Sequence, residues 1–191
     1  NYGTRNSFFP EFGLVAWAAR KVGRPVKWTA DRTESFLTDF QGRDLLVHAE
    51  LALDAEGRFL AMRGSNLSNV GAYGVSFVPL TKGVEIMTGL YRIPAAYFRA
   101  RAVHSNTPPT APYRSAGRPE VVFVLERLVD LAACQCGFDP VELRRMNLIP
   151  SSAMPYFNRL GMTYDSGEFA RSMDMVLALA DWSGYAARKK E

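Results

Sequence analysis

One stretch stands at the junction between a strand pattern and a helix pattern: Pro112-Tyr113-Arg114-Ser115-Ala116-Gly117-Arg118-Pro119-Glu120. Before it, residues 97–103 alternate as a β-strand does, and the pattern breaks at Pro108 and Pro109. After it, residues 120–133 form a dense apolar helix pattern. Small residues let the backbone approach a ligand closely, and a helix N-terminus directs N–H groups at an anion. The spacing alone favours an ordinary helix cap, and an anion-binding loop is the alternative interpretation that these residue types suggest.

A long β-hairpin is the clearest element upstream of this stretch. Apolar and polar residues alternate between residues 43 and 69, and residues 54–57 have turn chemistry. His48 falls on the polar side of the alternation, so we expect it to be solvated rather than catalytic. The Gly-, Asn- and Ser-rich end of the run, residues 64–71, indicates a bulge, a close approach to a ligand, or simple fraying.

The order of the predicted elements favours an α+β fold in two layers, with helices packed on a mixed β-sheet. Besides the hairpin, strands are predicted over residues 26–30 and 97–103, and a charged turn over residues 31–34. Helices are predicted over residues 10–22 and 81–87, from residue 120 to Gly137, from Pro140 to before Pro150, and after Glu168.

The composition is that of an ordinary globular protein. Of the 191 residues, 48% are hydrophobic and 22% are charged, and this length allows one well-filled core with or without an appendage. We expect no membrane segment, because no apolar run approaches the length of a span and residues 1–5 have no signal-peptide core. A cytoplasmic location is expected, with a periplasmic one left open. Since the chain starts without Met, we expect it to be part of a longer polypeptide.

The charge balance gives modest support for an anionic ligand. The formal net charge is +4, and the basic residues are spread along the chain rather than gathered on one segment. Arg92, Arg99 and Arg101 lie among aromatic residues, which makes nucleic-acid binding an alternative. The same residues alternate as in a half-buried strand, so we expect them to serve the fold and expect no nucleic-acid partner.

The cysteines and histidines do not form a metal-binding pattern. Cys134 and Cys136 stand two residues apart in a predicted helix, where their side chains point in different directions. We therefore expect two reduced thiols. With only His48 and His104 in addition, the chain lacks zinc-site spacing, and we expect no metal held by its own side chains.

An ordered set of motifs resembles one enzyme family. The motifs are Tyr2-Gly3-Thr4-Arg5, Gly23-Arg24-Pro25-Val26-Lys27-Trp28, Asp31-Arg32-Thr33-Glu34, Gly42-Arg43-Asp44, Gly71-Ala72-Tyr73, Tyr91-Arg92-Ile93-Pro94, Asn106-Thr107-Pro108, the stretch Tyr113 to Glu120, Glu126-Arg127, Asp139-Pro140, Arg144-Arg145-Met146-Asn147 and Tyr164-Asp165-Ser166-Gly167. In order and spacing, they are similar to the molybdopterin-binding subunit of the xanthine dehydrogenase, aldehyde oxidase and carbon monoxide dehydrogenase large-chain family. The resemblance covers nearly the whole chain.

The resemblance implies a molybdenum hydroxylase. In this family a molybdenum–molybdopterin cofactor, here expected in the cytosine dinucleotide form, hydroxylates a substrate carbon with oxygen derived from water. The implied partners are the remainder of the subunit, iron–sulfur and FAD components, and a small-molecule substrate. The family's general-base glutamate lies in a later domain, so no catalytic residue is expected in this chain, which alone is expected to be inactive and to carry no cofactor. We expect residues 1–191 to be part of one cofactor-binding domain, with residues 1–150 as the main core and residues 151–191 as a loop and C-terminal helix.

The resemblance also implies roles for six residues. Tyr2 and Gly3 correspond to the end of a Gly-rich loop beside the molybdenum, and Arg114 and Ser115 to a second cofactor-contacting loop. Ala116 corresponds to a substrate-facing position, and Lys82 to a substrate-orienting arginine.

Two departures from the family pattern narrow the substrate. Ser115 stands where the copper-containing carbon monoxide dehydrogenases have cysteine, which disfavours carbon monoxide oxidation. Ala116 replaces the aromatic residue of purine-oxidising relatives, which disfavours purine stacking. An aldehyde or an N-heterocycle is therefore the expected substrate. The alternative function is a stand-alone anion-binding or protein-interaction module without catalysis.

Overall fold

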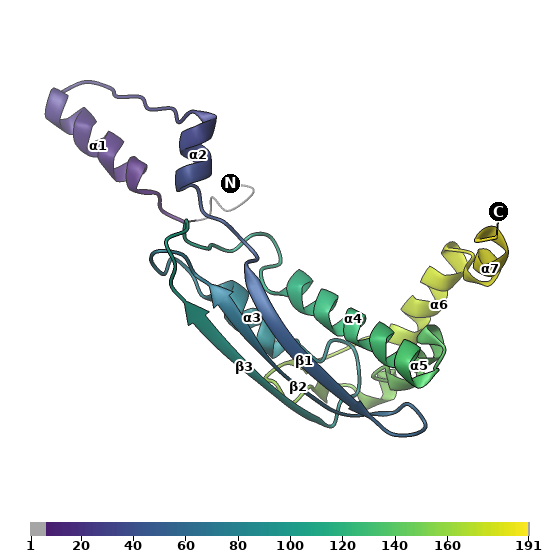
Figure 1. Ribbon diagram of the computed structural model, residues 1–191. Coiled ribbons are helices and arrows are strands. Elements are labelled where there is room, and N and C mark those ends of the chain that lie inside the picture. The colour runs from purple at the N-terminus through teal and green to yellow at the C-terminus, as the bar shows by residue number, and fades with distance from the viewer. Residues whose placement is uncertain (1–6, 191) are drawn as a thin grey trace. The chain divides into compact units, whose positions relative to one another are not determined.

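The computed structural model describes residues 7–190 and shows an α+β fold (Figure 1), as the sequence predicts. The helices are α1 (Pro10–Val22), α2 (Arg32–Thr38), α3 (Val78–Glu85), α4 (Arg118–Cys136), α5 (Pro140–Asn147), α6 (Phe169–Leu179) and α7 (Tyr185–Arg188), with 3₁₀ turns η1 (Ser151–Ala153) and η2 (Trp182–Gly184). The strands are β1 (Leu45–Leu53), β2 (Phe59–Asn69), β3 (Ala95–Val103), β4 (Tyr156–Phe157) and β5 (Thr163–Tyr164).

Strands β1, β2 and β3 form a mixed sheet in that order. The hairpin between β1 and β2 closes where the Gly57 N–H donates to the Asp54 carbonyl at 3.1 Å, so the predicted hairpin and its turn are confirmed. The Val70 N–H donates to the Val103 carbonyl at 2.9 Å just beyond the ends of β2 and β3, and the two strands point the same way in Figure 1. The sheet therefore combines an antiparallel hairpin with a parallel pair, and the chain between the parallel strands carries α3.

The chain divides into two compact units. The first comprises the residues up to His48, Ser65–Val84 and Arg99–Val121, and the second comprises Ala49–Gly64, Glu85–Phe98 and the residues from Val122 onward. The long strands and α4 contribute residues to both. In the first unit, Phe9 and Phe40 stack with ring centroids 4.4 Å apart and pack with Ala111. The predicted division of the chain at residue 150 stays a prediction.

The second unit is stabilised by buried apolar side chains and by the buried amide of Asn158. Its fully buried apolar side chains are Met87, Ile93, Val129, Leu143 and Ile149. Asn158, which is 0% exposed, accepts from the Leu160 and Met162 N–H groups and donates to the Glu85 carbonyl at 2.7 Å. The β4–β5 turn is thereby fixed to the last residue of α3.

A tyrosine and an arginine share one carboxylate in the second unit. The Tyr91 hydroxyl donates to Glu126 at 2.8 Å, and Arg144 Nε lies 2.7 Å from the same carboxylate while its Nη2 reaches Asp130 at 2.8 Å. Tyr91 is only 4% exposed. Burial, with a smaller contribution from the Glu126 charge, raises the pKa of Tyr91 above its ordinary value.

This raised pKa predicts an alkaline loss of stability. The neutral hydroxyl of Tyr91 is favoured in the folded state, so its contribution is complete below the unfolded pKa of about 10 and is lost as pH rises from there toward the folded pKa. A Tyr91→Phe variant of the full-length protein should lose less stability than the parent above about pH 10, as measured by unfolding at successive pH values. Equal pH dependence in the two proteins would contradict the assignment.

Several predicted elements differ from the structure. Residues 26–30 were expected to form a buried strand, but they have no regular structure, and Trp28 is 45% exposed. No described strand pairs with this run, and an unpaired run has no sheet to enter. The expected charged turn at residues 31–34 is instead the start of α2. There, the Asp31 side chain accepts from the Glu34 N–H at 2.8 Å and the Glu34 side chain accepts from the Asp31 N–H at 3.1 Å.

Other differences concern element ends and faces. Helix α3 covers residues 78–85 rather than 81–87, whereas β2 ends at Asn69 as predicted for the hairpin. The helical spacing of the apolar residues predicts that Val122 of α4 is buried, but it is 50% exposed. The same spacing predicts a buried face on α6 that includes Val176, but α6 holds no buried residue and Val176 is 63% exposed. Helix α5 begins as predicted, with the Asp139 side chain accepting from two backbone N–H groups.

Within residues 7–190, no helix is both long and apolar enough to cross a bilayer.

Candidate functional site

The predicted anion-binding loop is a tight turn that leads into α4. Ser115 has a φ of 64° and Gly117 a φ of 85°, both in the left-handed region. The Arg118 N–H donates to the Ser115 carbonyl at 2.8 Å, which closes the turn at the helix start. Arg114 and Ser115 are exposed, whereas Ala116 and Gly117 are buried. The loop therefore presents two polar side chains above a floor of small residues.

Two glycines bring α3 against this loop. A Cβ atom on Gly117 would lie 2.6 Å from the Gly83 nitrogen and 2.8 Å from the Pro79 carbonyl oxygen. Only a residue without a side chain permits this approach. Lys82, the predicted substrate-orienting residue, is exposed and directly precedes Gly83 in α3. The structure thus brings the helix that carries Lys82 next to the loop that carries Ala116, whose side chain is 8% exposed.

Arg43 is a further part of the site, to which sequence reasoning gave no role. Its Nη2 donates to the Arg114 carbonyl at 2.8 Å, and its Nη1 lies 3.1 Å from Glu120 Oε2. Its guanidinium carbon lies 5.2 Å from the centroid of the Tyr113 ring. The signal was present in the Gly42-Arg43-Asp44 motif, but the spacing of 71 residues between Arg43 and Arg114 hid the contact.

Glu120 leaves one polar atom unsatisfied. Its side chain is 10% exposed, and Oε2 pairs with Arg43. The other oxygen, Oε1, is buried and has no hydrogen-bond partner among the described residues. A buried polar atom without a partner costs free energy, so strongly packed surroundings are needed to keep it there.

The loop before the motif is tied to the end of β2. Asn69 donates to Asp44 and Thr107 and accepts from the Gly71 N–H at 2.9 Å and the Ser105 hydroxyl at 2.8 Å. Gly71 has a φ of 76°, and a Cβ there would lie 2.5 Å from the Pro108 carbonyl oxygen. A bulge, a close approach to a ligand and fraying were the alternatives for the Gly-rich end of β2, and the close approach seen at Gly71 is to the protein's own backbone.

Tyr2 and Gly3, which were predicted to contact the cofactor, lie outside the described residues. Their expected proximity to Arg114 stays a prediction.

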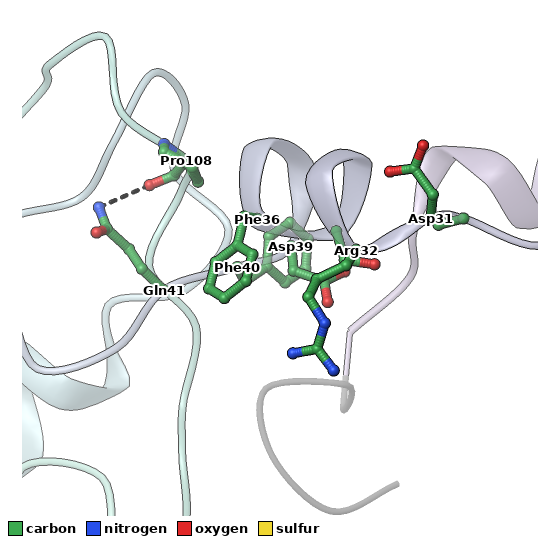
Figure 2. Close-up of a pocket in the computed structure, with 9 residues that line it drawn as sticks. Asp31, Arg32, Phe36, Asp39, Phe40, Gln41 and Pro108 are labelled. Carbon is green, nitrogen blue, oxygen red and sulfur yellow. Dashed lines mark hydrogen bonds between the residues drawn. The ribbon is translucent and has the colours of Figure 1, made fainter.

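A second hollow in the first unit has different chemistry. It has a volume of about 760 Å³ and is lined by Arg32, Phe36, Asp39, Phe40 and neighbouring residues. Figure 2 shows Phe36 and Phe40 among the residues that line it. Asp31 also lines the hollow, so two carboxylates outnumber the single guanidinium. An anionic group is not favoured there, and among the described residues Lys82, Arg114, Ser115 and Ala116 do not line it.

The Gln41 side chain closes one end of this hollow. Its Nε2 donates to the Pro108 carbonyl at 2.8 Å, as the dashed line in Figure 2 marks, and to the Thr107 hydroxyl at 2.9 Å. Gln41 thereby joins the chain entering β1 to the loop before the motif.

The titratable side chains of residues 7–190 include no group of three His, Cys, Asp or Glu residues placed to hold a metal ion. Cys134 and Cys136 are free and exposed.

Comparison with known proteins gives consistent matches. Residues 1–148 match the family model described as molybdopterin cofactor-binding domain. The chain is 36% identical over its full length to the 6-hydroxypseudooxynicotine dehydrogenase complex subunit gamma of Paenarthrobacter nicotinovorans, of which it covers 25%. Over 98% of its length it is 31% identical to the carbon monoxide dehydrogenase large chain of Hydrogenophaga pseudoflava, of which it covers 24%.

A solved structure shows the same fold. The crystal structure of quinoline 2-oxidoreductase from Pseudomonas putida 86 aligns with 98% of the chain at a TM-score of 0.92 and 31% identity, and the match covers 24% of that protein. The chain therefore spans about a quarter of the length of each of these three relatives.

Proposed function

We propose that this chain, which belongs to the molybdopterin cofactor-binding domain family, forms one wall of the cofactor site in a molybdenum hydroxylase. The observation that carries the proposal is the turn at residues 114–117, where exposed Arg114 and Ser115 stand over buried Ala116 and Gly117. In the longer protein, the site would oxidise an aldehyde or an N-heterocycle with oxygen derived from water. The part of the protein represented by this chain would be inactive alone.

The residues of the loop fit an anionic, oxygen-rich cofactor. The Arg114 guanidinium offers several N–H donors in a planar fork, and the Ser115 hydroxyl adds another donor. Gly117 holds the loop against α3, because its missing Cβ leaves room for the Gly83 backbone. When bound, the molybdenum–molybdopterin group supplies the redox chemistry, while Arg114 and Ser115 bind and orient it. Tyr2 and Gly3 are proposed to contact the same group.

An N-heterocycle or an aldehyde suits the substrate-facing positions. Ala116 offers no aromatic ring for stacking, and Ser115 stands in place of the cysteine associated with copper. The name of one relative specifies quinoline, which is an N-heterocycle. Lys82 is proposed to orient the substrate, because α3 packs against the loop at Gly83.

The proposal extends to the surroundings of the domain. We propose the cytosine dinucleotide form of the cofactor, iron–sulfur and FAD components as electron-transfer partners, and a cytoplasmic location. The remainder of the molybdopterin subunit is proposed to supply the general base.

Replacing Arg114 with alanine tests the cofactor role. In the full-length protein, Arg114→Ala should lower molybdenum and pterin content by about tenfold, because charge-assisted hydrogen bonds contribute about 1.5–3 kcal/mol each. Metal analysis and pterin fluorescence measure this loss. Arg99→Ala, an exposed arginine on β3, is the control and should retain the parent's content.

Two results would contradict the proposal. If Arg114→Ala keeps the cofactor content and turnover of the parent protein, Arg114 does not bind the cofactor. A parent protein without molybdenum or pterin in any preparation would instead favour the stand-alone binding module.

A further inference from the structure

We propose that Arg43 is a positioning residue that holds the peptide between Arg114 and Ser115 in one orientation, so that the Ser115 N–H can serve the cofactor as a donor. The inference rests on the proposed function, because it assigns a purpose to the orientation of this peptide. It concerns a residue 71 positions earlier in the chain than Arg114.

Arg43 makes three contacts with the loop and the start of α4. Its guanidinium donates to the Arg114 carbonyl at 2.8 Å, pairs with Glu120 at 3.1 Å and lies over the Tyr113 ring at 5.2 Å. The Glu120 side chain is only 10% exposed, so solvent screens this ion pair weakly. A planar fork with two engaged arms has little freedom to rotate, which fixes the position of the Arg114 carbonyl.

The carbonyls on both sides of Ser115 are engaged. The Arg114 carbonyl accepts from Arg43, and the Ser115 carbonyl accepts from the Arg118 N–H at 2.8 Å. In a trans peptide, the carbonyl and the following N–H point in opposite directions. Because Arg43 holds the Arg114 carbonyl, the Ser115 N–H must point to the side of the peptide away from Arg43.

The conformation of Ser115 explains why the peptide needs the hydrogen bond from Arg43. Its φ of 64° lies in the left-handed region, which costs free energy for a residue with a Cβ. A flip of the peptide before it would rotate the φ of Ser115 by about half a turn, out of that region. Backbone strain therefore favours the flip, and the hydrogen bond from Arg43 opposes it.

The test replaces Arg43 in the full-length protein. Arg43→Met keeps the length of the side chain but removes its donors. We expect amide exchange in peptides covering residues 112–118 of the cofactor-free protein to become about tenfold faster, the effect of one charge-assisted hydrogen bond. Molybdenum and pterin content should fall by a similar factor. The control is Arg63→Met, which breaks the exposed Arg63–Glu50 pair and should match the parent.

A second substitution separates peptide orientation from general stabilisation. Glycine adopts a φ of 64° without strain, so Ser115→Gly removes the force that favours the flip. In the Ser115→Gly background, Arg43→Met should change exchange and cofactor content by no more than about threefold, a clear departure from additivity. If Arg43→Met still changes amide exchange and cofactor content tenfold in that background, Arg43 stabilises the loop only through its ion pair, and the inference fails.

The remaining outcomes are equally decisive. If Arg43→Met and Arg63→Met behave alike, Arg43 does not hold the loop and the inference fails. If the parent carries no molybdenum or pterin, the proposed function fails, while the exchange measurements still decide whether Arg43 fixes the peptide.

Discussion

Replacing Gly117 with alanine is expected to open the loop at residues 114–117 and to cost about 2–5 kcal/mol of stability. The left-handed φ of 85° costs a residue with a Cβ about 1–2 kcal/mol. The new Cβ would also lie 2.6 Å from the Gly83 nitrogen, which belongs to a helix backbone and cannot rotate away as a side chain does. Helix α3 must therefore shift, and overpacking of this kind adds about 1–3 kcal/mol.

Gly137→Ala provides a matched control for this prediction. Gly137 ends α4 with a φ of 76°, and a Cβ there would meet nothing within 4 Å. The Gly137→Ala variant therefore has only the cost of the left-handed φ, about 1–2 kcal/mol. Hydrogen exchange of residues 78–85 and 112–121 in the full-length protein should increase strongly in Gly117→Ala and remain near the parent rate in Gly137→Ala. Similar exchange of these segments in both variants would show that contact with α3 does not hold the loop.

The elements that the sequence predicts well are those with local signals. Helix α1 runs from Pro10 to the left-handed Gly23, and α5 begins at the Asp139 cap, because caps and glycine stops act within a few residues. The β1–β2 hairpin follows from strict alternation and a turn at residues 54–57. Residues 26–30 have the composition of a strand, but no strand within residues 7–190 pairs with them, and strand pairing depends on distant parts of the chain.

The candidate site likewise has parts with local sequence signals and parts set by distant contacts. The loop from Tyr113 to Glu120 is recognisable from its small residues and the following helix pattern. The contacts of Arg43 with Arg114 and of Gly83 with Gly117 join segments far apart in the sequence, so spacing alone does not reveal them. A left-handed serine is also unexpected, since the energetic preference for glycine at such positions would place it at Gly117 only.

Replacing Asn147 with leucine is expected to destabilise the second unit by about 3–5 kcal/mol, because each buried polar group left without a partner costs about 1–3 kcal/mol. Asn147 is 4% exposed and accepts from the Phe59 N–H at 2.8 Å. It also donates to the Gly57 carbonyl at 2.9 Å and the Leu143 carbonyl at 2.8 Å. Leucine has a similar volume but removes the side-chain partner of all three backbone groups, so the hairpin end should separate from α5. Hydrogen exchange of residues 53–60 in the full-length protein measures this opening.

Asn147→Asp distinguishes hydrogen bonding from packing by its pH dependence. The carboxylate keeps the acceptor for the Phe59 N–H, but its second oxygen faces the two carbonyls that the amide served. Burial and these carbonyls should raise the folded-state pKa of this aspartate above its unfolded value of about 3.9. The variant is therefore most stable below the unfolded pKa and loses stability as pH rises toward the folded one. Asn147→Leu should show no such pH dependence of stability relative to the parent. If the stability of the two variants changes with pH in the same way, the volume of residue 147 and not its hydrogen bonds joins α5 to the hairpin.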